Sequence, residues 1–360
     1  MTNNTVITLF AVVAMFLISS TADAQILSIG TRVLRDDIPA TIQQTSVGLT
    51  HSLSNTFITH TEYSFVFADQ NEFHGLPRLR PSIHRIEQGI EARVASTGLG
   101  FAVKGALSRI HTGKVLGDFG LTAQYGFSWY AIENEAPVRF SFRAEAGRSR
   151  DVSVSTAMHE NVSFQHAQAQ LECDIAEEIQ LVGNATREWY HDGNRRDVAY
   201  IYSLVHPLSK PRISIGYAYS WADSERSTWR MTASTFDPIQ REYSYSYFYY
   251  PYFTPLKERG HQVLGIVQWW IIPDILLTAK ATVPVWSRGR MKYMPDSGPW
   301  PAPLDFDLTY EVEDILPQQY EAGLLIRLAT HMLAGIGVEY FKKPYYEYLQ
   351  GRLVLQYTFD

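Results

Sequence analysis

The C-terminal stretch from Tyr348 to Asp360 reads Y-L-Q-G-R-L-V-L-Q-Y-T-F-D, and its side chains alternate in character. One set is apolar or small: Leu349, Gly351, Leu353, Leu355, Tyr357 and Phe359. The other is mostly polar: Gln350, Arg352, Val354, Gln356 and Thr358. Because successive side chains of a strand point to opposite faces, the stretch predicts a strand with one apolar face. Its length suits a tilted strand that crosses a lipid bilayer.

Alternating segments of this kind recur along the whole chain. The predicted strands are 26–34, 42–53, 56–67, 82–95, 99–110, 118–129, 138–147, 166–172, 179–189, 198–206, 212–221, 261–272, 275–286, 319–328, 333–341 and 348–359. This pattern predicts sixteen strands, or eighteen if the aromatic region 222–257 contains two more crossings. With both termini on the inner side, strict alternation of short inner turns and longer outer loops places 222–257 and 288–317 outside.

Composition supports a barrel in a membrane. Aromatic residues make up 13% of the chain, with 22 Tyr, and mean hydropathy is only −0.15. No stretch after residue 24 has the eighteen consecutive apolar residues of a membrane-spanning helix. A soluble β-sandwich, the alternative, would bury faces richer in Leu, Ile and Val. We therefore predict an all-β fold, a transmembrane antiparallel β-barrel over residues 25–360, in the outer membrane of a Gram-negative bacterium.

The N-terminal 24 residues predict a signal peptide. An apolar run from Val6 to Ser19 precedes Ala22-Asp23-Ala24, a small-x-small cleavage pattern. Losing Asp23 changes the formal net charge from −6 to −5, and this acidity argues against nucleic-acid binding. The single cysteine, Cys173, allows no intrachain disulfide.

Charged residues on the predicted inward faces are the candidate lumen lining. They are Arg85, Glu87, Glu91, Arg93, Lys104, Asp118, Arg139, Arg143, Glu145, Arg212, Glu321, Arg327, Glu339 and Arg352. Such residues either brace a narrow lumen by pairing across strands or present both signs to a passing solute. Because the two signs nearly balance, neither alternative predicts strong anion or cation selection.

No catalytic motif is present, and we predict that the chain is not an enzyme and needs no cofactor. His60 with Glu62 and His166 with Glu172 could be read as acid–base pairs, but polar residues are expected on inward faces. The carboxylates between Asp296 and Asp314 match no calcium-binding loop, and a solvated acidic loop is the favoured interpretation.

The region 241–255 reads R-E-Y-S-Y-S-Y-F-Y-Y-P-Y-F-T-P. Aromatic faces stack on sugar rings, so it is a candidate sugar-stacking surface or lid. Its candidate residues are Tyr245, Tyr247, Tyr249, Tyr252 and Phe253. An aromatic girdle with a packed loop is the alternative.

One resemblance is carried by G-Y-A-Y-S-W at 216–221, P-Y-F-T-P at 251–255 and the strand beginning at His261. This region resembles the C-terminal barrels of bacterial exopolysaccharide exporters of the cellulose and poly-N-acetylglucosamine type. The resemblance implies sixteen strands and a channel for an exopolysaccharide. Those exporters carry a helical-repeat arm that has no counterpart here, so polymer export would require a separate periplasmic scaffold protein.

The expected function is therefore a passive outer-membrane channel for polysaccharide secretion. A general small-solute porin is the alternative, and a barrel-embedded enzyme or a surface-adhesion or structural barrel remains open. Expected partners are outer-membrane lipids, lipopolysaccharide and the barrel-assembly machinery. Phe359 near the chain end suits an assembly signal, although Asp360 follows it.

Overall fold

The computed structural model describes residues 25–36, 40–71, 78–94, 98–129, 138–152, 155–176, 178–225, 229–237, 242–249, 254–292, 297–298, 309–343 and 346–359. The predicted signal peptide, residues 1–24, lies outside the described residues. Among the described residues, no helix has the length and apolar character needed to cross a membrane.

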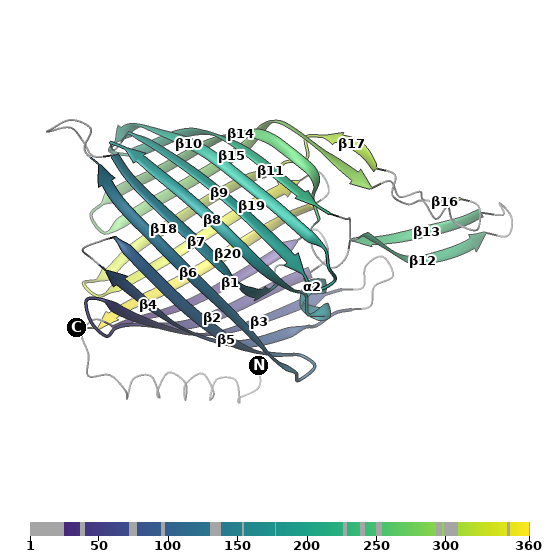
Figure 1. Cartoon of the computed structure of the whole chain (residues 1–360), viewed down its shortest axis with the longest axis horizontal. Coiled ribbons are helices and arrows are strands. Elements are labelled where there is room, and N and C mark those ends of the chain that lie inside the picture. Colours follow the sequence, from purple (N-terminus) through teal and green to yellow (C-terminus); the bar gives the residue numbers. More distant parts are fainter. Residues whose placement is uncertain are drawn as a thin grey trace.

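Sixteen antiparallel strands close into a barrel, which confirms the predicted fold class (Figure 1). They are β1 (Gln25–Asp36), β2 (Ala40–Ser52), β3 (Phe57–Gln70), β4 (Ser82–Val94), β5 (Leu99–Ile110), β6 (Val115–Trp129), β7 (Val138–Arg150), β8 (Ser163–Ile175), β9 (Ile179–Tyr190), β10 (Arg195–Ser209), β11 (Arg212–Ser224), β14 (Leu256–Ile272), β15 (Ile275–Lys292), β18 (Gln318–Ala329), β19 (Met332–Lys343) and β20 (Tyr346–Phe359). The C-terminal strand β20 pairs with both β19 and β1, from Gln25 opposite Phe359 to Asp36 opposite Tyr348. Closure leaves no unpaired strand edge in this wall.

The alternative of eighteen barrel strands is wrong. Within the aromatic region, β12 (Trp229–Asp237) and β13 (Glu242–Tyr249) pair with each other, and β13 also pairs with β16 (Ser297–Gly298). They cannot join the wall because β11 already pairs directly with β14. Figure 1 shows this small sheet extending beyond one end of the barrel. A further short strand, β17 (Thr309–Glu313), pairs with the far part of β15.

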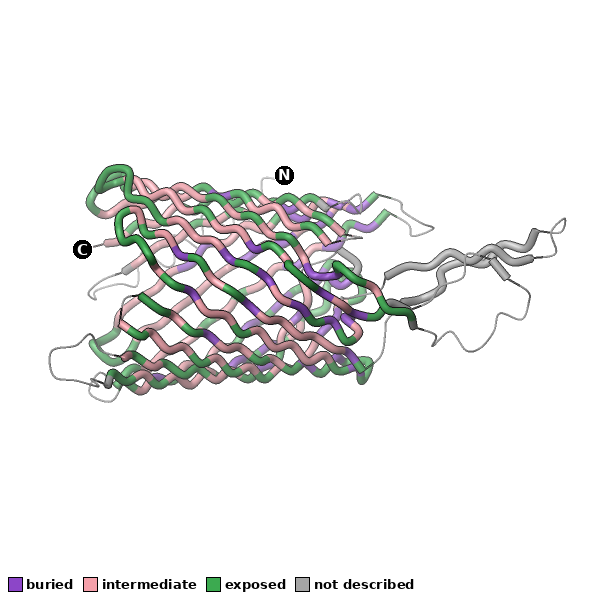
Figure 2. The backbone as a smooth tube through the Cα atoms, turned by 90° about the horizontal axis from the view of Figure 1, so that it is seen from above, coloured by how far each residue is buried: buried purple, intermediate pink, exposed green. Residues whose placement is uncertain are grey.

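The two ends of the barrel differ in their connections. The turn end contains the short links 210–211, 273–274 and 330–331, and the first residue of β1 and the last of β20 also lie there. The loop end contains the connections 71–81, 151–162, 225–255 and 293–317. Figure 2 shows many of the buried positions gathered toward the end that bears the projecting hairpin, which is the loop end.

The outward face of the wall is apolar and exposed. Leu107 is 63% exposed, Ile86 54% and Phe119 54%, and all three lie on the same face of adjoining strands. Their neighbours along each strand point into the barrel and are small, polar or charged. Large apolar side chains on the outside of a closed barrel are the arrangement required of a wall in contact with lipid.

Candidate pore

The predicted lumen residues all lie on the interior face, opposite the exposed apolar side chains. One group joins β4 to β6: Arg85 contacts Glu87 at 2.6 Å and Asp118 at 2.9 Å. Nearer the turn end, Arg93 contacts Glu91 at 2.5 Å. Of these three ion pairs, Arg85–Asp118 joins two strands of the wall, whereas the other two lie within β4.

A second group surrounds Glu145 on β7. Its carboxylate lies 3.3 Å from Lys104, 3.1 Å from Arg143 and 3.5 Å from the His166 ring. Lys104 reaches Glu145 across Gly120 of β6, which has no side chain to obstruct it. The lumen is therefore braced here across three strands.

Other predicted residues are paired less tightly or not at all. Lys280 contacts Glu321 at 2.9 Å, Tyr348 donates a hydrogen bond to Glu339, and Arg327 lies 3.7 Å from Asp274 at the turn end. Three cations form no ion pair with another described residue: Arg139, Arg212 and Arg352. Each alternative from the sequence therefore applies to part of the lumen. Some charged residues pair across strands and brace the wall, whereas others are unpaired and face the interior.

Of the two histidine–carboxylate pairs suggested by the sequence, the structure forms one. His60 lies 3.6 Å from Glu62, as the sequence suggests. The pairing of His166 with Glu172 is wrong: six residues along one strand separate them by about 20 Å. Glu172 instead accepts a hydrogen bond from Gln180 at 2.5 Å.

A short helix, α2 (Ser155–Glu160), is the element that the sequence analysis missed. It lies in the connection between β7 and β8 at the loop end (Figure 1). Asn161 ends it in the left-handed conformation, with φ of 58°, and donates its N–H to the Met158 carbonyl. Asparagine is one of the few residues that tolerate this conformation at a helix C-terminus.

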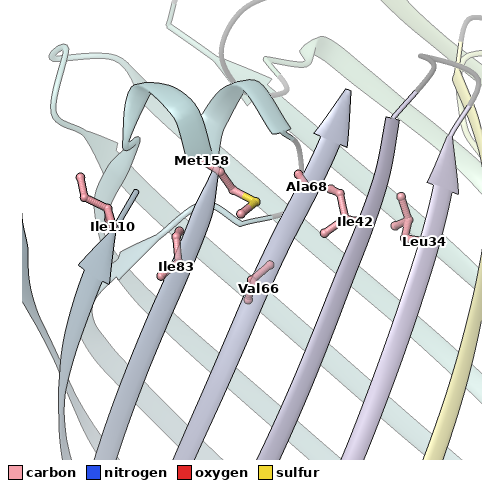
Figure 3. Close-up of a cluster of buried hydrophobic side chains, with 7 residues drawn as sticks. All are labelled: Leu34, Ile42, Val66, Ala68, Ile83, Ile110 and Met158. Carbon is pink, nitrogen blue, oxygen red and sulfur yellow. The ribbon is translucent and has the colours of Figure 1, made fainter. Parts of the chain in front are cut away.

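The helix packs against the inside of the wall. Met158 is fully buried in a cluster with interior side chains from β1 to β5 (Figure 3): Leu34, Ile42, Val66, Ala68, Ile83 and Ile110. On the other side, Ala157 packs with Val162 and with Tyr190 of β9. Because α2 contacts both the β1–β5 wall and β9, it lies across part of the lumen at the loop end.

Arg150 fastens this helical connection to the wall. Its guanidinium donates a hydrogen bond to the Asn161 side chain at 2.7 Å and lies 3.4 Å from Asp118. The side chains of Arg150 and Asp118 are 3% and 1% exposed. A buried carboxylate is stable only when compensated, and Asp118 sits between two guanidinium groups, those of Arg85 and Arg150.

On the opposite side of the loop end, a second set of contacts narrows the lumen. Lys343 of β19 reaches Glu258 of β14 at 3.1 Å, although β15 and β18 lie between these strands. Ile315 and Leu316, which precede β18, are both buried beside β14 and β15, and Leu316 N–H donates to the Ser287 hydroxyl. The lumen is therefore narrowed from two sides at this end.

Three of the five candidate sugar-stacking residues belong to a strand outside the barrel wall. Tyr245, Tyr247 and Tyr249 belong to β13 in the projecting sheet. Tyr252 and Phe253 lie outside the described residues. Much of the acidic loop 296–314 is likewise not described.

Several solved structures are similar to this chain. A structure described as a bacterial polysaccharide outer membrane secretin matches with a TM-score of 0.59 and 14% identity, covering 95% of this chain and all of that one. OccK7 (OpdD) of Pseudomonas aeruginosa matches with a TM-score of 0.43 and 9% identity, covering 94% of this chain and 99% of that one. OpdK of the same organism matches with a TM-score of 0.41 and 11% identity, covering 94% of this chain and 99% of that one.

The first of these matches confirms the predicted resemblance at the level of the fold. The chain has the fold of outer-membrane barrels. No model of a known protein family matches the chain, and no curated protein sequence matches it.

Proposed function

We propose that the protein is a passive outer-membrane channel through which an exopolysaccharide leaves a Gram-negative cell. The observation that carries this proposal is the combination of a lipid-facing apolar exterior with a charged, partly unpaired interior in a sixteen-stranded barrel. A barrel of this size encloses an aqueous path unless inserted segments fill it. The fold shared with a polysaccharide secretin supports the choice of cargo.

In this proposal the loop end faces the outside of the cell. The short turns at the other end suit the periplasmic side of such barrels. A polymer would enter at the turn end, past Arg139, Arg212 and Arg352, and leave beside α2. The projecting sheet of β12, β13 and β16 would then lie on the path of the emerging chain.

A general small-solute porin is the second candidate, and the mixed charge of the interior favours it. Opposite charges alternate around Glu145 and around Asp118, so the wall offers no continuous basic track for an anionic polymer. The two candidates differ in partners, since export requires a synthase and a separate periplasmic scaffold. Neither candidate includes catalysis at His60 or His166, and the lack of enzymatic activity stays a prediction.

Two measurements on one deletion strain separate these candidates. For an exporter, deletion should abolish secreted polymer, and the gene should lie beside a glycosyltransferase or polymer synthase. For a porin, secretion should be unchanged while uptake of small solutes falls.

Removing residues 241–255 from the chain tests the hairpin: an exporter should secrete less polymer, whereas a porin should conduct normally in planar bilayers.

A further inference from the structure

Basic residues on the outward face gather at one level, the loop end of the barrel. We call eight of them, each from a different strand, the rim belt: Arg35, Arg109, Arg148, Arg187, Arg195, Arg259, Arg288 and Lys342. Each lies within four residues of the loop end of its strand, the largest offset being Arg288 before Lys292.

The register shows that these side chains share the lipid-facing side of the wall. Arg35 is opposite Leu349, and Arg148 is opposite Phe119. Leu349 and Phe119 are 53% and 54% exposed. Arg35, Arg109, Arg148 and Lys342 are themselves exposed.

The other end of the same face has no charge. In the described barrel strands, outward positions between the rim belt and the turn end contain no Asp, Glu, Lys or Arg. Aromatic and aliphatic residues occupy that end, including Phe127, Trp269, Ile271 and Phe359. The outward charge is therefore confined to one side of the membrane.

Some of the rim belt is neutralised by nearby carboxylates. Asp197 lies 2.6 Å from Arg187 and 3.4 Å from Arg195, and Arg288 pairs with Glu311. Five other members form no ion pair with another described residue: Arg35, Arg109, Arg148, Arg259 and Lys342. Remaining outward carboxylates at this level are Asp69, Asp223, Glu313 and Glu347, and Asp69 already pairs with Arg78 and Arg80.

We propose that the rim belt binds the phosphate groups of lipid headgroups in the leaflet at the loop end. With the apolar face in the acyl chains, side chains just beyond it emerge at headgroup depth. Guanidinium groups bind phosphate oxygens in bidentate fashion, and each basic residue near an anionic membrane surface adds about 1 kcal/mol. A polymer inside the lumen cannot reach these residues, because they point away from it. The proposal rests on the membrane insertion that the proposed function also assumes, but not on any passage of polymer.

The test uses the full chain with four substitutions: Arg35→Gln, Arg109→Gln, Arg148→Gln and Lys342→Gln. The matched control removes four interior cations: Arg32→Gln, Arg139→Gln, Arg212→Gln and Arg352→Gln. The probes are a diphosphorylated glycolipid (lipid A), its dephosphorylated form and inorganic phosphate, each added to protein in neutral detergent. Bound glycolipid is counted by native mass spectrometry, and the thermal transition is recorded alongside.

The unsubstituted protein and the interior control should bind the diphosphorylated glycolipid equally and gain thermal stability from it. The rim variant should bind more than about tenfold more weakly, given four lost cations. Equal binding by the rim variant overturns the proposal, as does equal binding of the dephosphorylated glycolipid or an equal stabilisation by inorganic phosphate. If the fourfold variant does not fold, the single variants Arg109→Gln and Arg148→Gln should each bind the diphosphorylated glycolipid more weakly, and unchanged binding by both overturns the proposal.

Failure of the proposed function has a different signature. A chain that does not insert into lipid vesicles contradicts both proposals. Normal insertion with unchanged glycolipid binding contradicts the rim belt alone.

Discussion

The loop end and the turn end of the lumen use the same interior face and the same residue types, yet they differ in packing. At the loop end the side chains of Arg150 and Glu258 are 3% and 7% exposed. Toward the turn end those of Arg93 and Arg143 are 56% and 55% exposed. The wall alone therefore makes a wide tube, and segments inserted between strands decide where it is narrow.

Removing helix α2 should have the largest effect on the difference in lumen width between the two ends. Replacing Ser155–Glu160 with six Gly and Ser residues leaves the wall intact but removes the Met158 anchor. We expect the single-channel conductance in planar bilayers to rise at least about twofold, because the narrowest section of an aqueous pore limits conduction.

Replacing Ser54-Asn55, an exposed turn at the other end, with Gly-Gly is the control and should leave conductance unchanged. An unchanged conductance in the α2 variant as well would show that α2 does not limit the pore. The single change Met158→Ala should destabilise the packed helix by about 2–5 kcal/mol, which in open-channel recordings should appear as added noise.

The Glu258–Lys343 pair offers the next largest effect. Glu258→Gln or Lys343→Met alone removes one member of this buried ion pair and should cost about 3–5 kcal/mol of unfolding free energy. The double variant should recover most of that loss. Urea unfolding followed by tryptophan fluorescence in detergent measures all three.

The less buried pair Lys280–Glu321 is the matched comparison, since its side chains are 37% and 26% exposed. Lys280→Met should cost less than about 1 kcal/mol. If Lys280→Met and Lys343→Met lower the free energy of unfolding equally, the difference in burial between the two ion pairs does not affect stability.

The smallest predicted effect is a dependence of the conductance on pH. His111, in the turn after β5, stacks on His159 of α2 with ring centroids 5.2 Å apart. Burial, and then the nearby His159, lower the pKa of His111 below its usual value. Because protonated His111 is disfavoured when α2 is docked, docking is fully stable above the ordinary histidine pKa near 6.5 and weakens as pH falls below it.

Conductance should therefore rise slightly between pH 7 and pH 5. In a His111→Gln variant this rise should be smaller, and an identical pH profile would exclude His111 as its source. Both rings are largely exposed, so solvent keeps the effect small.

All sixteen predicted strands are present, because alternation against lipid leaves a clear pattern in the residues. The predicted strands fall short mainly at the loop end: 275–286 is β15, which continues to Lys292, and 138–147 is β7, which continues to Arg150. Alternation of apolar residues stops where a strand leaves the acyl chains, yet backbone pairing continues. At these strand ends the outward positions hold the charged residues of the rim belt, so the sequence shows no apolar alternation there.

The contribution of α2 to the narrowing at the loop end could not be predicted. The segment containing α2 is too short and too mixed in character to show a helical period, and its burial depends on side chains from β1 to β5 and β9. Arg150, Glu258 and Lys343 show no local sign of their partners, since Lys343 and Glu258 are 85 residues apart. The charges on regular interior positions, such as Arg85 and Glu145, were predictable from alternation alone.

The seam between β1 and β20 has a consequence for assembly. Every other strand pairing in the wall joins consecutive barrel strands, so fifteen hairpin-like pairings can form in chain order. The seam joins residues more than 300 positions apart, from Gln25 opposite Phe359 onward, and its loop-closure entropy opposes early formation. Until it forms, an almost complete sheet has two open edges in lipid, where unpaired backbone groups are costly. Closure of this one seam therefore makes assembly all-or-none, and a substitution that breaks its register should affect yield far more than one in any hairpin.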